Sequence, residues 1–331
     1  MTTRFVRRSN RMGAIAASVA ITLSLFGLAG LTSTALHRTG HGQKDPAPVS
    51  YEEDGTTSAL ASSTLEGSIQ QLTYEQAYEG TTYEKEALVY VPPTDTPGVP
   101  ANIVYLIHGW WGTADGLAEG VAPIVDQLTS AGSIAPTIVV FATYYPDRSF
   151  ATEDYEDDYA LNRFFATTEI DTLIEAVESR YTTYARGDTS DESLRASRRH
   201  RAFGGFSMGA TTTWDVFALR PQYFYGYMPM AGESWIGREE EADSAQIAQL
   251  VTAGAERAHY GPQDFRILAS VGSLDPALGD MAPQLAQLRA DYPDLMTDDS
   301  LQMWIDEGET HSMTSVGNQV AHDLPILFPP A

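Results

Sequence analysis

The sequence contains no cysteine among its 331 residues. That absence excludes disulfides, a thiol nucleophile, cysteine-bound metal and a lipid attached to a lipoprotein cysteine. Basic residues are also scarce, because 20 Lys and Arg stand against 44 Asp and Glu, for a net charge of −24. A chain this acidic is unsuited to nucleic acid or to an anionic membrane surface, so neither is expected as a partner of the folded region.

Charge is missing from one long stretch near the N-terminus. Several arginines precede an uncharged, Ala- and Leu-rich run at residues 12–36. This is typical of a secretory signal, and the run is also long enough to remain as an uncleaved anchor. We therefore expect residues 1–36 to be a signal peptide or signal anchor and the protein to be secreted or extracytoplasmic, touching a membrane only through that anchor.

The next segment, residues 37–66, is rich in Ser, Thr, Pro and Gly, which predicts a flexible linker. The folded region is then expected at 67–331, with no internal repeat and no second domain boundary.

Within that region strand patterns alternate with helix patterns. Strands are expected at 83–91, 101–107, 136–142, 201–204, 223–230, 265–271 and 301–305. Helices are expected at 114–131, 160–181, 209–219, 244–258, 281–289 and 316–328. The first strand ends at two prolines and is expected to be antiparallel, whereas the later runs read as strands covered on both faces. The alternation predicts an α/β fold, a mostly parallel, doubly wound sheet with helices on both faces.

The chain is organised around a G-x-S-x-G pentapeptide at residues 205–209. Strand, sharp turn and helix is the setting of a nucleophile elbow, in which a strained serine lifts its hydroxyl clear of the sheet. Glycines two positions before and two after Ser207 remove Cβ atoms that would collide as the strand and helix close together. A Gly/Ser-rich turn explains the pentapeptide alone equally well, so the hypothesis depends on the other catalytic groups.

An acyl-transfer serine needs a general base, and in an α/β-hydrolase sheet that histidine follows the serine along the chain. His311 lies in a polar loop directly after the last strand, where such a base belongs. His259 adjoins the helix expected at 244–258, away from any strand end. His322 falls in the final helical pattern and is expected to be a surface or packing histidine. We therefore predict His311 as the base.

The acid that orients the base should follow the preceding strand. Asp275 does so, in Gly-Ser-Leu-Asp-Pro after the strand at 265–271, and is the predicted acid. Asp280 stands at the start of a helix, where a capping role suffices, and Asp306 lies too close to His311 along the chain.

An oxyanion hole should combine the amide after the nucleophile with one from the loop after the strand at 101–107. The first donor is then Met208, and the second is Trp110, in the His-Gly-Trp-Trp-Gly loop at 108–112. His108 is expected to brace this loop by hydrogen bonds rather than to take part in the chemistry.

With these residues assigned, the chain resembles the α/β-hydrolase-fold esterases of the esterase-D-like superfamily, and within it the feruloyl and acetyl-xylan esterases of carbohydrate esterase family 1. The matching segments are YLIHGWWG at 105–112, HRAFGGFSMGATTTW at 200–214, YGYMPMAGESW at 225–235, VGSLDPA at 271–277 and GETHSM at 308–313. The resemblance covers about residues 75–330 and implies the same nucleophile, acid, base and oxyanion amides. The Trp-Trp pair departs from the smaller residues that relatives often carry after His-Gly, and no carbohydrate-binding module or fused xylanase is recognisable.

The expected activity is hydrolysis of carboxylic esters through an acyl-enzyme, with no metal and no cofactor. The expected substrates are feruloyl or acetyl esters of an acylated polysaccharide or oligosaccharide such as xylan. Trp111, Tyr144 and Trp235 fall on predicted strand-end loops and are candidates for stacking on a feruloyl ring or a sugar, although each could equally be a packing residue. The acidic run EDYEDD at 153–158 is expected to be a solvated face rather than a calcium or cationic-substrate site.

Two other readings stay open. An acyltransferase or a serine peptidase on the same fold would carry the same catalytic residues. A non-catalytic envelope binding protein is disfavoured, because an inactive chain would usually lack one of them.

Overall fold

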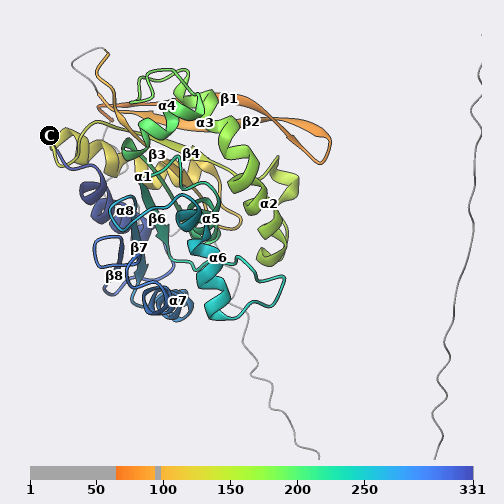
Figure 1. The fold of residues 1–331 in the computed structure, drawn as a ribbon. Helices are drawn as coiled ribbons and strands as arrows, with labels where there is room; N and C mark the ends of the chain where they lie inside the picture. Colours follow the sequence, from red (N-terminus) through yellow and green to blue (C-terminus); the bar gives the residue numbers. More distant parts are fainter. Residues whose placement is uncertain (1–64, 94–97, 331) are drawn as a thin grey trace, which may run out of the picture. The chain divides into compact units, whose positions relative to one another are not determined.

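The computed structural model describes residues 65–93 and 98–330 (Figure 1). The expected signal or anchor, and the linker up to residue 64, lie outside the described residues. Within those two ranges no helix is both long enough and apolar enough to cross a membrane.

One eight-stranded sheet forms the centre of the fold, in the order β1-β2-β4-β3-β5-β6-β7-β8. The strands are β1 (Ser68–Tyr78), β2 (Thr81–Val91), β3 (Asn102–Ile107), β4 (Thr137–Ala142), β5 (Arg201–Phe206), β6 (Gly226–Met230), β7 (Arg266–Gly272) and β8 (Leu301–Asp306). β2 pairs antiparallel with both β1 and β4, and every other pairing is parallel. The predicted mostly parallel sheet, with an early antiparallel strand, is therefore confirmed.

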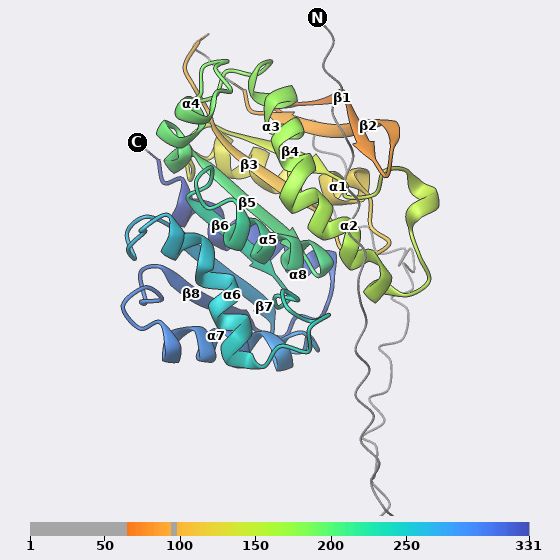
Figure 2. The same ribbon diagram turned by 45° about the vertical axis from the view of Figure 1, so that its right-hand side comes forward.

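The helices lie on both faces of the sheet (Figure 2). They are α1 (Ala114–Ser130), α2 (Tyr159–Phe164), α3 (Ile170–Glu178), α4 (Asp191–Ala196), α5 (Met208–Leu219), α6 (Ser244–Arg257), α7 (Leu278–Asp291) and α8 (Met313–Leu327). α1 and α8 bury their apolar sides on one face, and α3, α5, α6 and α7 on the other, giving two hydrophobic cores separated by the sheet. The central strands β3 and β4 are buried at every position, which explains their uninterrupted apolar sequences.

The long helix predicted at 160–181 is interrupted. A five-residue π-helical turn, Phe165–Glu169, separates α2 from α3. The turn ends on Glu169, a buried carboxylate that accepts a hydrogen bond from the Tyr74 hydroxyl at 2.6 Å and pairs with Lys85 Nζ at 2.5 Å. These partners come from β1 and β2, so helical spacing alone could not reveal them.

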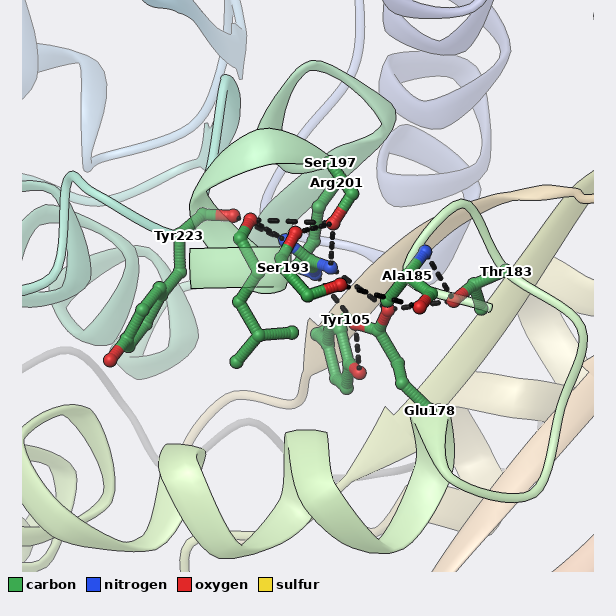
Figure 3. A network of polar contacts seen from close by, with 9 residues as sticks. Tyr105, Glu178, Thr183, Ala185, Ser193, Ser197, Arg201 and Tyr223 are labelled. Atoms are coloured by element: carbon green, nitrogen blue, oxygen red, sulfur yellow. Dashed lines mark hydrogen bonds and ion pairs between the residues drawn. The ribbon is translucent and has the colours of Figure 1, made fainter. Parts of the chain in front are cut away.

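A buried ion pair holds the start of β5, the strand that leads to Ser207 (Figure 3). The Arg201 guanidinium donates to both carboxylate oxygens of Glu178, at 2.6 and 2.9 Å. Its remaining donors reach the Leu194 and Tyr223 carbonyls and the Ser197 hydroxyl. Because both charges are almost completely buried, this satisfaction of every donor offsets the cost of removing them from water.

Candidate active site

Ser207 occupies the turn between β5 and α5 with φ 57° and ψ −116°. This conformation is strained for a residue with a Cβ, and it is held by a hydrogen bond from the Ser207 amide to the Met230 carbonyl at 2.8 Å. The approach of strand and helix requires both flanking glycines. A Cβ on Gly205 would lie 2.5 Å from the Gly209 carbonyl oxygen, and one on Gly209 would lie 2.4 Å from the Ile107 carbonyl oxygen. The turn therefore has the strand–turn–helix geometry that the pentapeptide predicts.

The structure brings His311 and Asp275 together, although 36 positions separate them along the chain. His311 Nδ1 lies 2.8 Å from one Asp275 carboxylate oxygen and 3.1 Å from the other. The Asp275 side chain is fully buried, whereas that of His311 is 25% exposed. Since a carboxylate accepts, Nδ1 carries the proton and Nε2 is left as the acceptor that a general base requires.

The two loops that carry these residues are tied to each other. The Leu274 amide donates to the Glu309 carbonyl at 2.9 Å, and the Gly308 amide donates to the Ser273 hydroxyl at 2.8 Å. A Cβ on Gly272 would lie only 2.3 Å from the Glu309 carbonyl oxygen, so the loops meet at van der Waals contact. Their parallel strands β7 and β8 end side by side, which places the carboxylate within reach of the imidazole.

The imidazole of His311 also lies against the turn that carries Ser207. Its ring centroid is 4.3 Å from that of Phe206, the residue before Ser207. No hydrogen bond joins the Ser207 hydroxyl to His311 within the described chain. Such catalytic hydrogen bonds are often long in a free enzyme and shorten when substrate binds.

Asp306, at the end of the last strand, and His322, in the last helix, have structural partners. Asp306 accepts hydrogen bonds from Ser315 and Asn318, both at 3.0 Å, at the start of α8. His322 Nδ1 contacts Asp323 at 2.8 Å and its ring stacks on Trp304. Asp280 lies in the first turn of α7, where its negative charge interacts favourably with the helix dipole.

The loop after β3 lies against Ser207. A Cβ on Gly109 would come within 3.1 Å of the Ser207 Cβ. The neighbouring Trp110 amide donates to no acceptor in the described part of the chain, and Met208 is the first residue of α5, where amides lack an intrahelical acceptor. Both amides are thus available to a ligand oxygen.

His108 braces this loop, as expected. The Gly109 carbonyl can only accept, so His108 Nδ1 donates to it at 2.7 Å, and Nε2 accepts from the Thr143 hydroxyl at 2.7 Å. Burial lowers the pKa of His108 to about 4, which keeps the ring neutral and preserves this pattern at physiological pH.

The three aromatic candidates for substrate contact differ in exposure. Trp111, within the loop at 108–112, is 41% exposed and is open to a ligand. Tyr144 has no exposed surface, because it packs against His108 and Tyr145, and this burial favours its role as a packing residue. Trp235 is 8% exposed and packs against Tyr155, which also contacts Trp110.

The acidic residues of the run at 153–158 differ in their burial. Glu153, Asp154, Glu156 and Asp157 are exposed, in line with a solvated face. Asp158 is fully buried and accepts hydrogen bonds from the Tyr145 hydroxyl at 2.5 Å and the Thr152 hydroxyl at 3.0 Å. Across residues 65–93 and 98–330, no group of three or more carboxylate or imidazole side chains is arranged to hold a metal ion.

Sequence comparison finds a curated relative. The chain is 29% identical over 261 residues to endo-1,4-beta-xylanase Y of Acetivibrio thermocellus, covering 77% of this chain. The match spans only 23% of that protein, so the chain corresponds to less than a quarter of the curated relative's length. No protein-family model matches the chain.

Solved structures give the same picture. A feruloyl esterase module from Clostridium thermocellum, in complex with sinapinate, superposes with a TM-score of 0.68 at 28% identity, over 82% of this chain and 91% of that one. A ferulic acid esterase of carbohydrate esterase family 1 from Anaeromyces mucronatus (TM-score 0.59, 17% identity, 78% and 90% covered) shares the fold. So does S-formylglutathione hydrolase from Staphylococcus aureus (TM-score 0.53, 12% identity, 79% and 97% covered).

Proposed function

We propose that this chain, an α/β-hydrolase-fold carboxylic ester hydrolase resembling the feruloyl esterases of carbohydrate esterase family 1, acts through a Ser207–His311–Asp275 triad. The main support for this triad is the contact between His311 Nδ1 and the buried Asp275 carboxylate, next to a serine with the strained backbone of a nucleophile elbow. The remaining nitrogen, Nε2, is left to accept the proton of the serine hydroxyl.

The reaction follows from these positions. Nε2 of His311 removes the Ser207 proton as the hydroxyl oxygen attacks the ester carbonyl, and the Trp110 and Met208 amides stabilise the oxyanion. His311 then returns the proton to the departing alcohol, which leaves an acyl-serine. A water molecule, deprotonated by the same imidazole, hydrolyses that ester and releases the acid. Asp275 holds the imidazole tautomer and stabilises the imidazolium throughout.

We propose feruloyl or closely related aromatic acyl esters on plant cell-wall xylan as the substrate. Support comes from the feruloyl esterase module that shares 28% identity and from the match within a xylanase. Trp111, an exposed residue of the oxyanion loop, offers a surface on which an aromatic acyl group or a sugar ring can stack.

We also propose that the protein is exported. The support is the arginine-rich start and the apolar run within residues 1–36, which resemble a secretory signal. N-terminal sequencing of protein recovered from culture medium tests this directly. Retention of the full-length chain inside the cell would contradict it.

Turnover of a substrate panel tests the activity. The full chain, its Ser207→Ala variant and a Ser190→Ala control from the remote α4 cap are compared on p-nitrophenyl acetate, methyl ferulate, acetylated xylan and a peptide amide. We expect ferulate release by the parent and the control and its loss in Ser207→Ala. Acetate release from xylan without ferulate release would show that the acyl group is acetyl rather than feruloyl. Cleavage of the peptide amide would indicate a peptidase, and acyl transfer to an added sugar would indicate an acyltransferase.

A further inference from the structure

The oxyanion loop has a strained residue directly after the proposed donor Trp110. Trp111 has φ 59°, a left-handed conformation that a bulky side chain rarely adopts. Such strain persists only where surrounding contacts determine it. The orientation of the peptide groups on either side of Trp111 therefore depends on whatever holds this residue.

An arginine holds the carbonyls that follow. Arg148, in the segment after β4, donates to the Trp111 carbonyl at 2.7 Å and to the Gly112 carbonyl at 2.9 Å. Its guanidinium carbon also lies 5.2 Å from the centroid of the Trp111 ring and 5.6 Å from that of Tyr145. A planar guanidinium can bridge two successive carbonyls in this way, whereas an ammonium acts as a point charge.

A tyrosine holds the amide. The Tyr145 hydroxyl accepts a hydrogen bond from the Trp111 amide at 3.2 Å and donates to the buried Asp158 carboxylate at 2.5 Å. Because the tyrosine proton is directed to Asp158, its oxygen lone pairs face the Trp111 amide. Asp158 is in turn held by Thr152, so the buried end of the acidic run is anchored beneath the loop.

We propose that Tyr145, Arg148 and Asp158 form an oxyanion-loop clamp, a set of positioning residues that fixes Trp111 and so aims the Trp110 amide at the oxyanion. The inference rests on the function proposed above. It assigns a role to Asp158 within the acidic run and to two residues that contact no reacting atom.

The clamp matters because oxyanion stabilisation is geometric. Removing one donor from an oxyanion hole costs about 10²–10³ in kcat, and a misplacement of about 1 Å costs about 10²-fold. Relaxation of Trp111 to a negative φ would rotate the Trp110–Trp111 peptide group. Because the Trp110 N–H lies in the peptide group just before it, the backbone of Trp110 would transmit the rotation and move that N–H away from its target. The oxyanion hole stabilises the transition state and not the bound substrate. Its misplacement should therefore lower kcat and kcat/KM together and leave KM unchanged.

The test uses Arg148→Ala and Tyr145→Phe in the full chain. Arg148 is exposed, so its removal should leave the fold intact, and Tyr145→Phe keeps the ring. We expect kcat on p-nitrophenyl acetate to fall about 10- to 100-fold for Arg148→Ala and about 10-fold for Tyr145→Phe, with KM within about twofold. Arg148→Lys should recover only part of the loss, because it cannot bridge both carbonyls.

Phenylboronic acid supplies a readout that a merely structural role would not move. It forms a tetrahedral adduct on a reactive serine, with a hydroxyl in the position of the oxyanion. Its inhibition constant should rise in each variant by the same factor by which kcat/KM falls.

Matched controls lie at the opposite ends of the strands. Arg199 also stacks on a tyrosine, Tyr225, and donates to a main-chain carbonyl at 3.0 Å, so Arg199→Ala should leave kcat unchanged. Tyr223 donates to Asp191 at 2.8 Å, which makes Tyr223→Phe the control for Tyr145→Phe.

Unchanged kcat in the clamp variants would overturn the inference, as would a raised KM at constant kcat or an unchanged boronate affinity. Activity surviving in Ser207→Ala would instead overturn the proposed function, so the two failures are distinguishable.

Discussion

Asp215 is a buried acid whose ionisation should make the fold less stable as the pH rises from about 4 to about 7. It lies in α5, fully buried, with Arg163 Nη1 at 3.5 Å and the Tyr159 hydroxyl at 3.3 Å from one carboxylate oxygen. The other oxygen has no hydrogen-bond partner among the described residues. Burial outweighs the Arg163 charge and raises the pKa of Asp215 from 3.8 to about 7.

The sign and size of the effect follow by linkage. The folded-state pKa lies above the unfolded one, so the contribution to stability is complete below about pH 4 and is lost as the pH rises through about 7. A shift of about 3 units at 1.36 kcal/mol each gives a maximum loss of about 4 kcal/mol, of which about 2 to 3 kcal/mol falls between pH 5 and pH 8.

Urea unfolding of the parent and of Asp215→Asn over about pH 5 to pH 8 measures this loss. The amide keeps the shape of the side chain and cannot ionise, so the stability of the variant relative to the parent should increase with pH by about 2 to 3 kcal/mol. Asp323, whose pKa burial raises to about 6, titrates in both proteins and cancels in the comparison. A difference independent of pH would refute the reasoning, because it would mean that Arg163 keeps Asp215 ionised throughout.

Three further substitutions test the catalytic geometry and the fold. Asp275→Asn should lower kcat on p-nitrophenyl acetate by about 10⁴ with KM little changed, because an amide favours the wrong imidazole tautomer; a loss below about tenfold would contradict the role of Asp275. Arg201→Met should cost about 3–5 kcal/mol of unfolding free energy in urea by leaving the Glu178 carboxylate buried and unpaired, and adding Glu178→Leu should recover part of it. Gly209→Ala should destabilise by at least about 1–3 kcal/mol, since its Cβ would lie 2.4 Å from the Ile107 carbonyl oxygen; a thermal midpoint equal to that of the parent would show that the helix can shift.

Much of the fold could be read from local patterns. The buried strands β3, β4 and β7 and the helices α1 and α6 lie within a few residues of their predicted bounds, because uninterrupted apolar runs and helical spacing reflect burial directly. Strand β1 is not apparent from the sequence pattern. It pairs with β2 from Ser68 opposite Val91 to Tyr78 opposite Thr81, and its exposed positions carry many polar residues, so its apolar signal is weak.

The residues of the candidate site also fall into those that the sequence indicates and those that it does not. Ser207, Asp275 and His311 could be selected because each follows a strand in a fixed chain order, and parallel strands deliver their carboxyl ends to one edge of the sheet. The clamp residues could not, because Arg148 and Tyr145 carry no motif and act on a loop more than 30 positions earlier in the chain.

The sequence by itself determined the α/β architecture, the elbow glycines and the order of the candidate catalytic residues, since all of these depend on neighbours within a few positions. Only the tertiary structure decided that Trp111 is open to solvent while Tyr144 is buried. It also decided that Asp158, unlike its exposed acidic neighbours, is buried against the Tyr145 hydroxyl, and that burial raises the pKa of Asp215 to about 7. Burial and ion pairing depend on elements that meet only when the chain has folded, and no local pattern records those meetings.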